Sequence, residues 1–279
     1  ENIISIITPN YNGVKRIKQC YESVKQQKYR DFEWIIVDDN SSDQSVNIIR
    51  DLIMEDVRII LITSKERLGP AGARNIGIKN ANGSLIFFLD SDDYIKDTCL
   101  SDLYSSYCRY NVDMIIGDFL IIEGDVSYPS KNSLFFGKDE LLENNLLIEY
   151  ILTYLSKPNK FPIFTSCWGK LFRKSIIDDF KISFDENLKT FEDIDFVFRF
   201  MNYADKIFFL NRVIYFHTIE RGFSSATMNL GQDVNTLFGY FKALESVRQY
   251  LEKNTVEKKV CDKYVGLATV NYTIIQLIR

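Results

Sequence analysis

Three aspartates follow an apolar run in the first third of the chain. Asp90, Asp92 and Asp93 come directly after five apolar residues at 85–89, a run that is typical of a buried strand. Carboxylates are hard oxygen ligands that suit Mg²⁺ or Mn²⁺ shared with phosphate oxygens. A metal at this position would neutralise charge that appears on a departing diphosphate. The alternative interpretation is a turn or a helix cap, where Ser and Asp are also common.

A second acidic group lies in the segment 190–196, Thr-Phe-Glu-Asp-Ile-Asp-Phe. Its carboxylates, Glu192, Asp193 and Asp195, stand near the start of a predicted helix, where the helix dipole favours acidic residues in any case. One of them could instead deprotonate an acceptor hydroxyl as a general base. Neighbouring residues of a helix point about 100° apart, so we expect Glu192 and Asp193 not to reach the same atom. We expect Asp195 to form a structural cap or pair.

The elements that must position these groups alternate between strands and helices. Strands are predicted at 3–8, 33–38, 57–62, 85–90 and 112–118, and helices at 14–27, from Ser41 and at 70–81. Ser41 and Gln44 resemble a capping box, and Pro70 suits a first helical turn. This rhythm predicts an α/β fold with a mostly parallel, Rossmann-like sheet and flanking helices. Because the carboxyl ends of parallel strands lie at one edge, the polar residues that follow each strand should meet there.

The remainder of the chain is less regular. We expect loops or edge strands at 123–138, a helix at 139–156, a loop at 158–168, a helix at 192–203, and strands at 206–210 and 213–217. Val234, Leu237, Phe238, Phe241, Leu244, Val247 and Leu251 form one helical stripe, and a second helix is predicted from Val256 to the end. The stripe must be buried, and packing on the preceding domain is the preferred interpretation. A homodimer interface or a peripheral membrane contact is the alternative, which the mixed charges of the region weaken.

Several rim residues suit a nucleotide. Tyr11 could stack on a base, or it could be a packed turn aromatic. Asp38 and Asp39 could accept hydrogen bonds from a base or ribose, or they could cap the next helix. Arg74 could pair with a phosphate, hold Asp39, or be a surface charge.

Three further residues in the second half of the chain are candidates. His217 is the sole histidine and ends a predicted strand, although lone histidines are usually structural. Arg221 could grip a diphosphate. Trp168 could stack on an acceptor sugar, or it could be a half-buried core residue.

The composition excludes some classes of protein. The 279 residues carry a net charge of −4, so no basic excess indicates nucleic acid as a partner. The five cysteines are odd in number and form no CxxC pair, which argues against a disulfide framework or zinc ribbon and favours the cytoplasm. We see no run long enough to span a membrane and no signal peptide.

Taken as a set, the motifs resemble those of the family 2 glycosyltransferases, which are inverting enzymes of the A-type glycosyltransferase (GT-A) fold. The bacterial members that build surface polysaccharides are the most similar in character. The matching segments are 6–12 (IITPNYN), 36–42 (IVDDNSS), 72–77 (GARNIG), 88–94 (FLDSDDY), 168–172 (WGKLF) and 191–196 (FEDIDF). They occur in the family's order. We therefore expect a glycosyltransferase domain at 1–225, with a nucleotide-binding half at 1–120 and an acceptor-binding half at 121–225, and a helical extension at 226–279.

The resemblance implies a role for each matching position. The nucleobase pocket would be lined by Thr8, Pro9, Tyr11 and Asp39, with Asp39 facing uracil and Arg74 beside the pocket. Asp90 would face the ribose. Asp92 would be the chief ligand of Mn²⁺ or Mg²⁺ in the Asp-x-Asp (DxD) motif. Asp193 would be the general base, with Glu192 as its neighbour. His217 and Arg221 occupy places where relatives often contact the diphosphate or metal. The Gln-x-x-Arg-Trp motif of processive synthases is missing, which disfavours a polymerase of that type.

We therefore predict a metal-dependent transferase that moves a sugar from a UDP-sugar to a saccharide or lipid-linked saccharide, in the cytoplasm or at the inner face of the membrane. A nucleotidyltransferase should carry a Gly-rich, basic loop after the first strand, where this chain has Thr8-Pro-Asn-Tyr-Asn12. A non-catalytic sugar-nucleotide-binding or scaffold protein is the other alternative. Such a protein should lose the metal or base carboxylate, yet Asp92 and Asp193 are both present.

Overall fold

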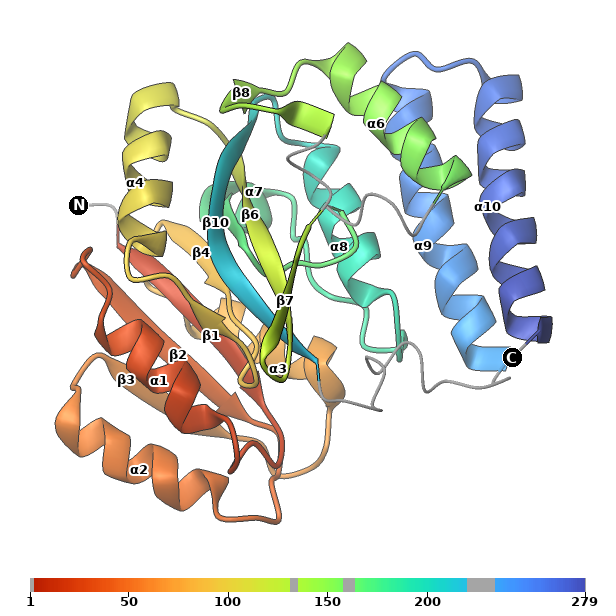
Figure 1. Cartoon of the computed structure of the whole chain (residues 1–279). Helices are drawn as coiled ribbons and strands as arrows, with labels where there is room; N and C mark the ends of the chain where they lie inside the picture. Colours follow the sequence, from red (N-terminus) through yellow and green to blue (C-terminus); the bar gives the residue numbers. More distant parts are fainter. Residues whose placement is uncertain (1–2, 131–134, 158–163, 220–233, 279) are drawn as a thin grey trace.

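The fold is a ten-stranded α/β sheet with helices on both faces (Figure 1). A computed structural model describes residues 3–130, 135–157, 164–219 and 234–278. The main strand order is β3-β2-β1-β4-β9-β6-β10-β5, with β7 paired to β6 and β8 paired to β10. The predicted α/β class with a mostly parallel sheet is confirmed.

The first four main strands are parallel and alternate with helices. The elements are β1 (Ile4–Asn10), α1 (Ile17–Lys25), β2 (Phe32–Asp38), α2 (Ser45–Glu55), β3 (Ile59–Thr63), α3 (Gly69–Asn80) and β4 (Leu85–Phe88). Pro70 lies in the first turn of α3, as predicted. The predicted capping box is wrong, because α2 begins at Ser45 and the Ser41 hydroxyl donates to Asp38 over 2.6 Å instead.

The other half of the sheet is mixed. It contains β5 (Tyr94–Ile95), β6 (Met114–Glu123), β7 (Val126–Pro129), β8 (Glu140–Leu141), β9 (Lys170–Arg173) and β10 (Ile207–Ile219). Strand β9 runs antiparallel between β4 and β6 and was not predicted. The two strands predicted at 206–210 and 213–217 form the single strand β10, whose register against β6 shifts after Leu210.

The remaining helices are α4 (Cys99–Tyr110), α6 (Asn144–Ser156), α7 (Lys174–Asp179), α8 (Glu192–Met201), α9 (Val234–Lys253) and α10 (Lys258–Ile278). Side chains alternate between the two faces of the sheet, so β1 sends Ile6 into a core shared with α1, α2 and α4, and Ile7 into a core shared with α3, α6, α8 and α9. None of the described helices is long and apolar enough to cross a bilayer.

The C-terminal helices complete the second of these cores. Helix α9 packs against α8, and α10 packs against α6 and α9 (Figure 1). Leu244, Val247 and Leu251 of the predicted stripe are buried there, as the preferred interpretation required. Phe238 and Phe241 are instead 59% and 43% exposed, so the stripe is buried only in part.

Candidate functional site

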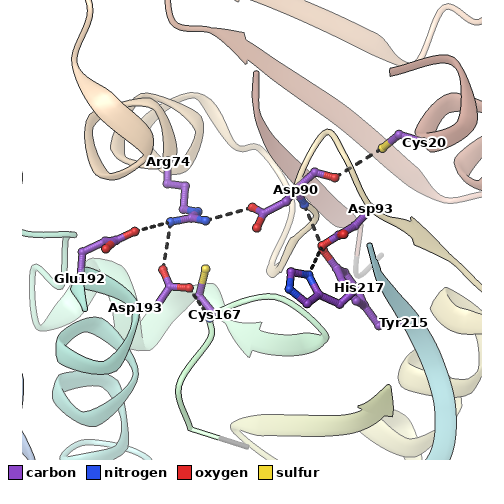
Figure 2. Close-up of polar contacts among 9 residues, drawn as sticks. All are labelled: Cys20, Arg74, Asp90, Asp93, Cys167, Glu192, Asp193, Tyr215 and His217. Carbon is purple, nitrogen blue, oxygen red and sulfur yellow. Dashed lines mark hydrogen bonds and ion pairs between the residues drawn. The ribbon is translucent and has the colours of Figure 1, made fainter. Parts of the chain in front are cut away.

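A buried arginine joins three carboxylates at the centre of the candidate site (Figure 2). Arg74 of α3 is 4% exposed, and its Nη2 lies 2.9 Å from Asp90 Oδ1. Its Nη1 lies 3.1 Å from Glu192 Oε1 and 2.9 Å from Asp193 Oδ1. Arg74 therefore ties the carboxyl end of β4 to the first turn of α8, and its observed ion pairs do not include Asp39.

The expectation that Glu192 and Asp193 would not reach the same atom is wrong. Both carboxylates contact Nη1 of Arg74, because Arg74 reaches the start of α8 from α3. Phe191, directly before the helix, takes a left-handed φ of 63°. Asp195 accepts from Ser246 of α9 over 2.6 Å and pairs with Arg199, so the predicted structural role is confirmed.

One guanidinium cannot neutralise three carboxylates. Burial, together with the negative charge of Asp193, raises the pKa of Glu192 to about 7, although Arg74 opposes the shift. The other oxygen of Asp193, Oδ2, accepts the backbone N–H of Cys167 over 3.0 Å. Asp193 is therefore fixed in orientation by two donors.

Asp90, Asp92 and Asp93 lie close together after β4, with one carboxylate oxygen from each within 4.8 Å of the others. The surrounding protein and the charges of Asp93 and Asp90 raise the pKa of Asp92 to about 7, although its side chain reaches solvent. Three carboxylates at such short separation repel one another unless a cation lies among them. The oxygen-only donor set fits Mg²⁺ or Mn²⁺.

Within this acidic group, Asp93 is already occupied by protein donors. Its Oδ2 accepts the Tyr215 hydroxyl over 2.7 Å and lies 3.1 Å from His217 Nδ1 (Figure 2). Its Oδ1 accepts the Thr218 N–H over 2.7 Å. Burial lowers the pKa of His217, but the hydrogen bond and charge of Asp93 outweigh it and the net shift is upward. Asp92 and Asp90 are thus the better placed of the three for an external cation.

Trp168 stacks on two side chains that contact Asp93. Its ring stacks on Tyr215 at a centroid distance of 4.5 Å and on His217 at 5.0 Å, and it meets Phe119 edge-on at 4.9 Å. Both sequence interpretations survive, because the ring is partly buried and also borders the site.

The nucleotide-side candidates are largely engaged with the protein. Thr8 Oγ1 accepts Trp34 Nε1–H over 2.8 Å, and Asp38 Oδ2 accepts from Asn10 over 2.7 Å. Asp39 receives the N–H groups of Leu68 and Gly69 over 2.7 and 2.9 Å, which fixes the start of α3. Asp38 Oδ2 also accepts the Ser41 hydroxyl, whereas Asp39 Oδ2, with the Gly69 N–H as its donor, keeps a lone pair for a ligand.

Tyr11 and Pro9 lie at the same edge. Tyr11 is 40% exposed, and the guanidinium of Arg67 lies 3.7 Å from its ring centre, a partner that sequence reasoning missed. Pro9 is partly buried near the end of β1. Arg221 lies outside the described residues. No role was predicted for Tyr215, which lies inside a strand-like run, or for Lys170, which is part of the 168–172 motif.

A helix-covered sheet with clustered carboxylates after one of its strands agrees with the GT-A glycosyltransferase fold that the motifs predict. The chain belongs to glycosyl transferase family 2, whose profile matches residues 5–180. The predicted family is confirmed.

Curated relatives support this assignment. Glycosyltransferase GlyG of Streptococcus pneumoniae serotype 4 is 30% identical over 226 residues, which cover 79% of this chain and 72% of GlyG. Poly(ribitol-phosphate) β-N-acetylglucosaminyltransferase TarP of Staphylococcus aureus is 29% identical over 268 residues, 91% of this chain and 74% of TarP. For another relative, pneumococcal GlyA, the match spans only 31% of its length.

A solved structure shows the same fold. Residues 1–349 of S. aureus TarS in complex with UDP-GlcNAc superimpose with a TM-score of 0.73 at 23% identity, covering 94% of this chain and 70% of that one. A Pyrobaculum calidifontis mannosyltransferase in complex with GDP-Man and Mn²⁺ gives a TM-score of 0.56 at 14% identity, covering 95% of this chain and 68% of that one. These likenesses concern the fold alone.

Proposed function

We propose that this glycosyltransferase moves a sugar from a UDP-sugar to a hydroxyl of a saccharide or lipid-linked saccharide in surface-polysaccharide synthesis, with inversion at the anomeric carbon. The observation that carries this proposal is that Arg74 separates two carboxylate groups with different surroundings. A carboxylate group suited to a cation lies on one side, and Asp193, fixed by two donors, lies on the other.

Asp92 and Asp90 would hold Mn²⁺ or Mg²⁺, with the remaining ring nitrogen of His217 nearby as a third contact. The bound ion would supply charge neutralisation for the departing diphosphate. Asp93 would not be a ligand of the ion, because its oxygens already contact Tyr215, His217 and Thr218. Arg74 holds Asp90 on the donor side.

Asp193 would take the proton of the acceptor hydroxyl as that oxygen attacks the anomeric carbon opposite the diphosphate. Both of its oxygens already accept one hydrogen bond, and each retains a lone pair for the incoming proton. Arg74 and the Cys167 N–H keep the carboxylate in one orientation, which is what base catalysis by a positioned group requires. Glu192 would support Arg74, and Trp168 would border the acceptor sugar.

The uridine assignment rests on Tyr11 and Asp39 at the nucleotide edge, and on the TarS complexes with UDP and UDP-GlcNAc as relatives of the same fold. The five cysteines are all free, which supports a cytoplasmic place of work.

The test of the donor is a thermal-shift series. UDP with Mn²⁺ should raise the melting temperature more than GDP with Mn²⁺, because ligand binding stabilises the folded state by mass action. A preference for GDP contradicts the uridine assignment.

NMR of the product distinguishes the stereochemistry, since an α-linked D-sugar donor should give a β-linked product and a retained configuration excludes inversion.

A further inference from the structure

Lys170 is a buried cation without a carboxylate partner among the described residues. It begins β9 and is 2% exposed. Its ammonium donates to the Ser166 carbonyl over 2.6 Å, to Ser166 Oγ over 3.3 Å and to the Trp168 carbonyl over 3.4 Å. Burial lowers its pKa to about 8. A buried ammonium lowers the stability of the folded protein unless its hydrogen bonds compensate. The three hydrogen bonds of Lys170 therefore indicate a specific role for this residue.

The three bonds close one turn of the chain, residues 166–169, on itself. Gly169 has a φ of +68°, which glycine adopts without the steric strain that a side chain brings. Its carbonyl accepts the N–H of Gly117 in β6 over 3.0 Å. The turn is therefore anchored to the sheet on one side and to the Lys170 ammonium on the other.

The 166–169 turn contacts one acidic group of the site directly and the other through two aromatic side chains. The Cys167 N–H binds Asp193 Oδ2 over 3.0 Å (Figure 2). The next residue, Trp168, stacks on Tyr215 and His217, which in turn bind Asp93. A displacement of this turn would disturb the orientation of Asp193 first, because the Cys167 N–H is the direct contact.

We propose that Lys170 is a positioning residue, which fixes the 166–169 turn so that the Cys167 N–H orients Asp193 for transfer. The inference rests on the proposed role of Asp193 as the base. A charged donor that serves several oxygens of one turn fixes it more firmly than a neutral donor would. Misplacement of a reacting group by about 1 Å costs about 10²-fold in rate.

The test begins with Lys170→Met, which keeps the length of the apolar stem and removes the ammonium. Turnover should fall by about 10- to 100-fold, while KM for the donor and the calorimetric affinity for UDP with Mn²⁺ stay unchanged. Lys174→Met is the matched control, because the Lys174 ammonium pairs with Asp178 within α7, and it should keep full turnover.

A double-mutant cycle separates positioning from a general structural role. In an Asp193→Asn background, Lys170→Met should lower turnover little further, because Lys170 acts through the residue already removed. A multiplicative loss in the double variant overturns the inference, as does unchanged turnover in Lys170→Met. A weak effect of Asp193→Asn itself would contradict the proposed base instead, so the two failures are distinguishable.

Ser166→Ala gives the same answer if Lys170→Met does not fold. It removes one of the three acceptors and leaves the ammonium in place. Turnover should fall by a smaller factor than in Lys170→Met with UDP affinity unchanged, and the loss should again disappear in the Asp193→Asn background. Unchanged turnover in this variant, or a loss that persists beside Asp193→Asn, counts against the proposal.

Discussion

The two acidic groups of the site look alike in sequence and differ in their surroundings. In the 90–93 group, one oxygen from each of three carboxylates lies within 4.8 Å of the others. Among the described residues, the ion pairs of this group are Arg74 with Asp90 and His217 with Asp93. In the 192–195 group, every carboxylate has an arginine partner, Arg74 or Arg199. We therefore propose that the first group binds an external cation, whereas the second keeps its carboxylates fixed in place.

Arg74 makes the two groups dependent on one another. It lies between them with one nitrogen facing Asp90 and the other facing Glu192 and Asp193. The difference between the groups suggests that a fixed carboxylate suits proton transfer, whereas crowded carboxylates suit metal binding. Variants that neutralise one residue at a time can break or sharpen this contrast.

The largest effect is expected at Asp193. Asp193→Asn removes the proton acceptor and should lower transfer by about 10²–10⁴-fold, the usual contribution of general base catalysis. UDP affinity should stay near normal in calorimetry, because the nucleotide side of the site is untouched. Glu192→Gln alters the other carboxylate on the same Arg74 nitrogen and should retain much more transfer. Equal losses in the two variants would erase the distinction between them.

The next largest effect is expected at Asp92. Asp92→Asn keeps the shape and removes a charged ligand, and turnover should fall by about 10²–10³-fold, as when one electrostatic contact to a transition state is lost. Calorimetry should show weaker Mn²⁺-dependent UDP binding, in contrast with Asp193→Asn. Asp51→Asn, an exposed position on α2, is the control. Full turnover of the wild type in EDTA would exclude a metal-dependent mechanism.

The sequence predicts the first half of the fold well, since buried parallel strands and the helices between them carry strong periodic patterns. It misses β9, whose four residues are too few for periodicity and which pairs with two strands distant in sequence. The candidate carboxylates were all visible as motifs. The hydrogen bonds that connect them could not be predicted, because they join residues far apart in the sequence. Arg74 and Glu192 are separated by 118 residues, and Tyr215 and Asp93 by 122.

A moderate effect on stability is expected at Asp195, the structural member of its group. Ser246→Ala removes the 2.6 Å hydrogen bond between α9 and the buried Asp195 carboxylate. The free energy of unfolding should fall by about 1–3 kcal/mol, because a buried acceptor loses one partner. Denaturant unfolding measures the change, with Ser105→Ala on the exposed side of α4 as the control. Turnover per folded molecule should not change, and a catalytic defect would place Asp195 with Asp193.

The smallest effect is expected in the pH dependence of stability. Burial and Asp193 raise the pKa of Glu192 to about 7 in the folded state, well above its ordinary value in an unfolded chain. Between these two values the folded state binds the extra proton, so this contribution to stability is present in acid and is lost as the pH rises towards 7. Glu192→Gln removes the contribution. The difference in unfolding free energy between wild type and variant should therefore decrease from pH 5 to pH 7, with a slope no steeper than about 1.4 kcal/mol per pH unit. Urea unfolding of both proteins at several pH values measures this slope. A difference that stays flat from pH 5 to pH 7 would show that Arg74 dominates and keeps Glu192 ionised in the folded state. Both carboxylates on its nitrogen would then be equally fixed.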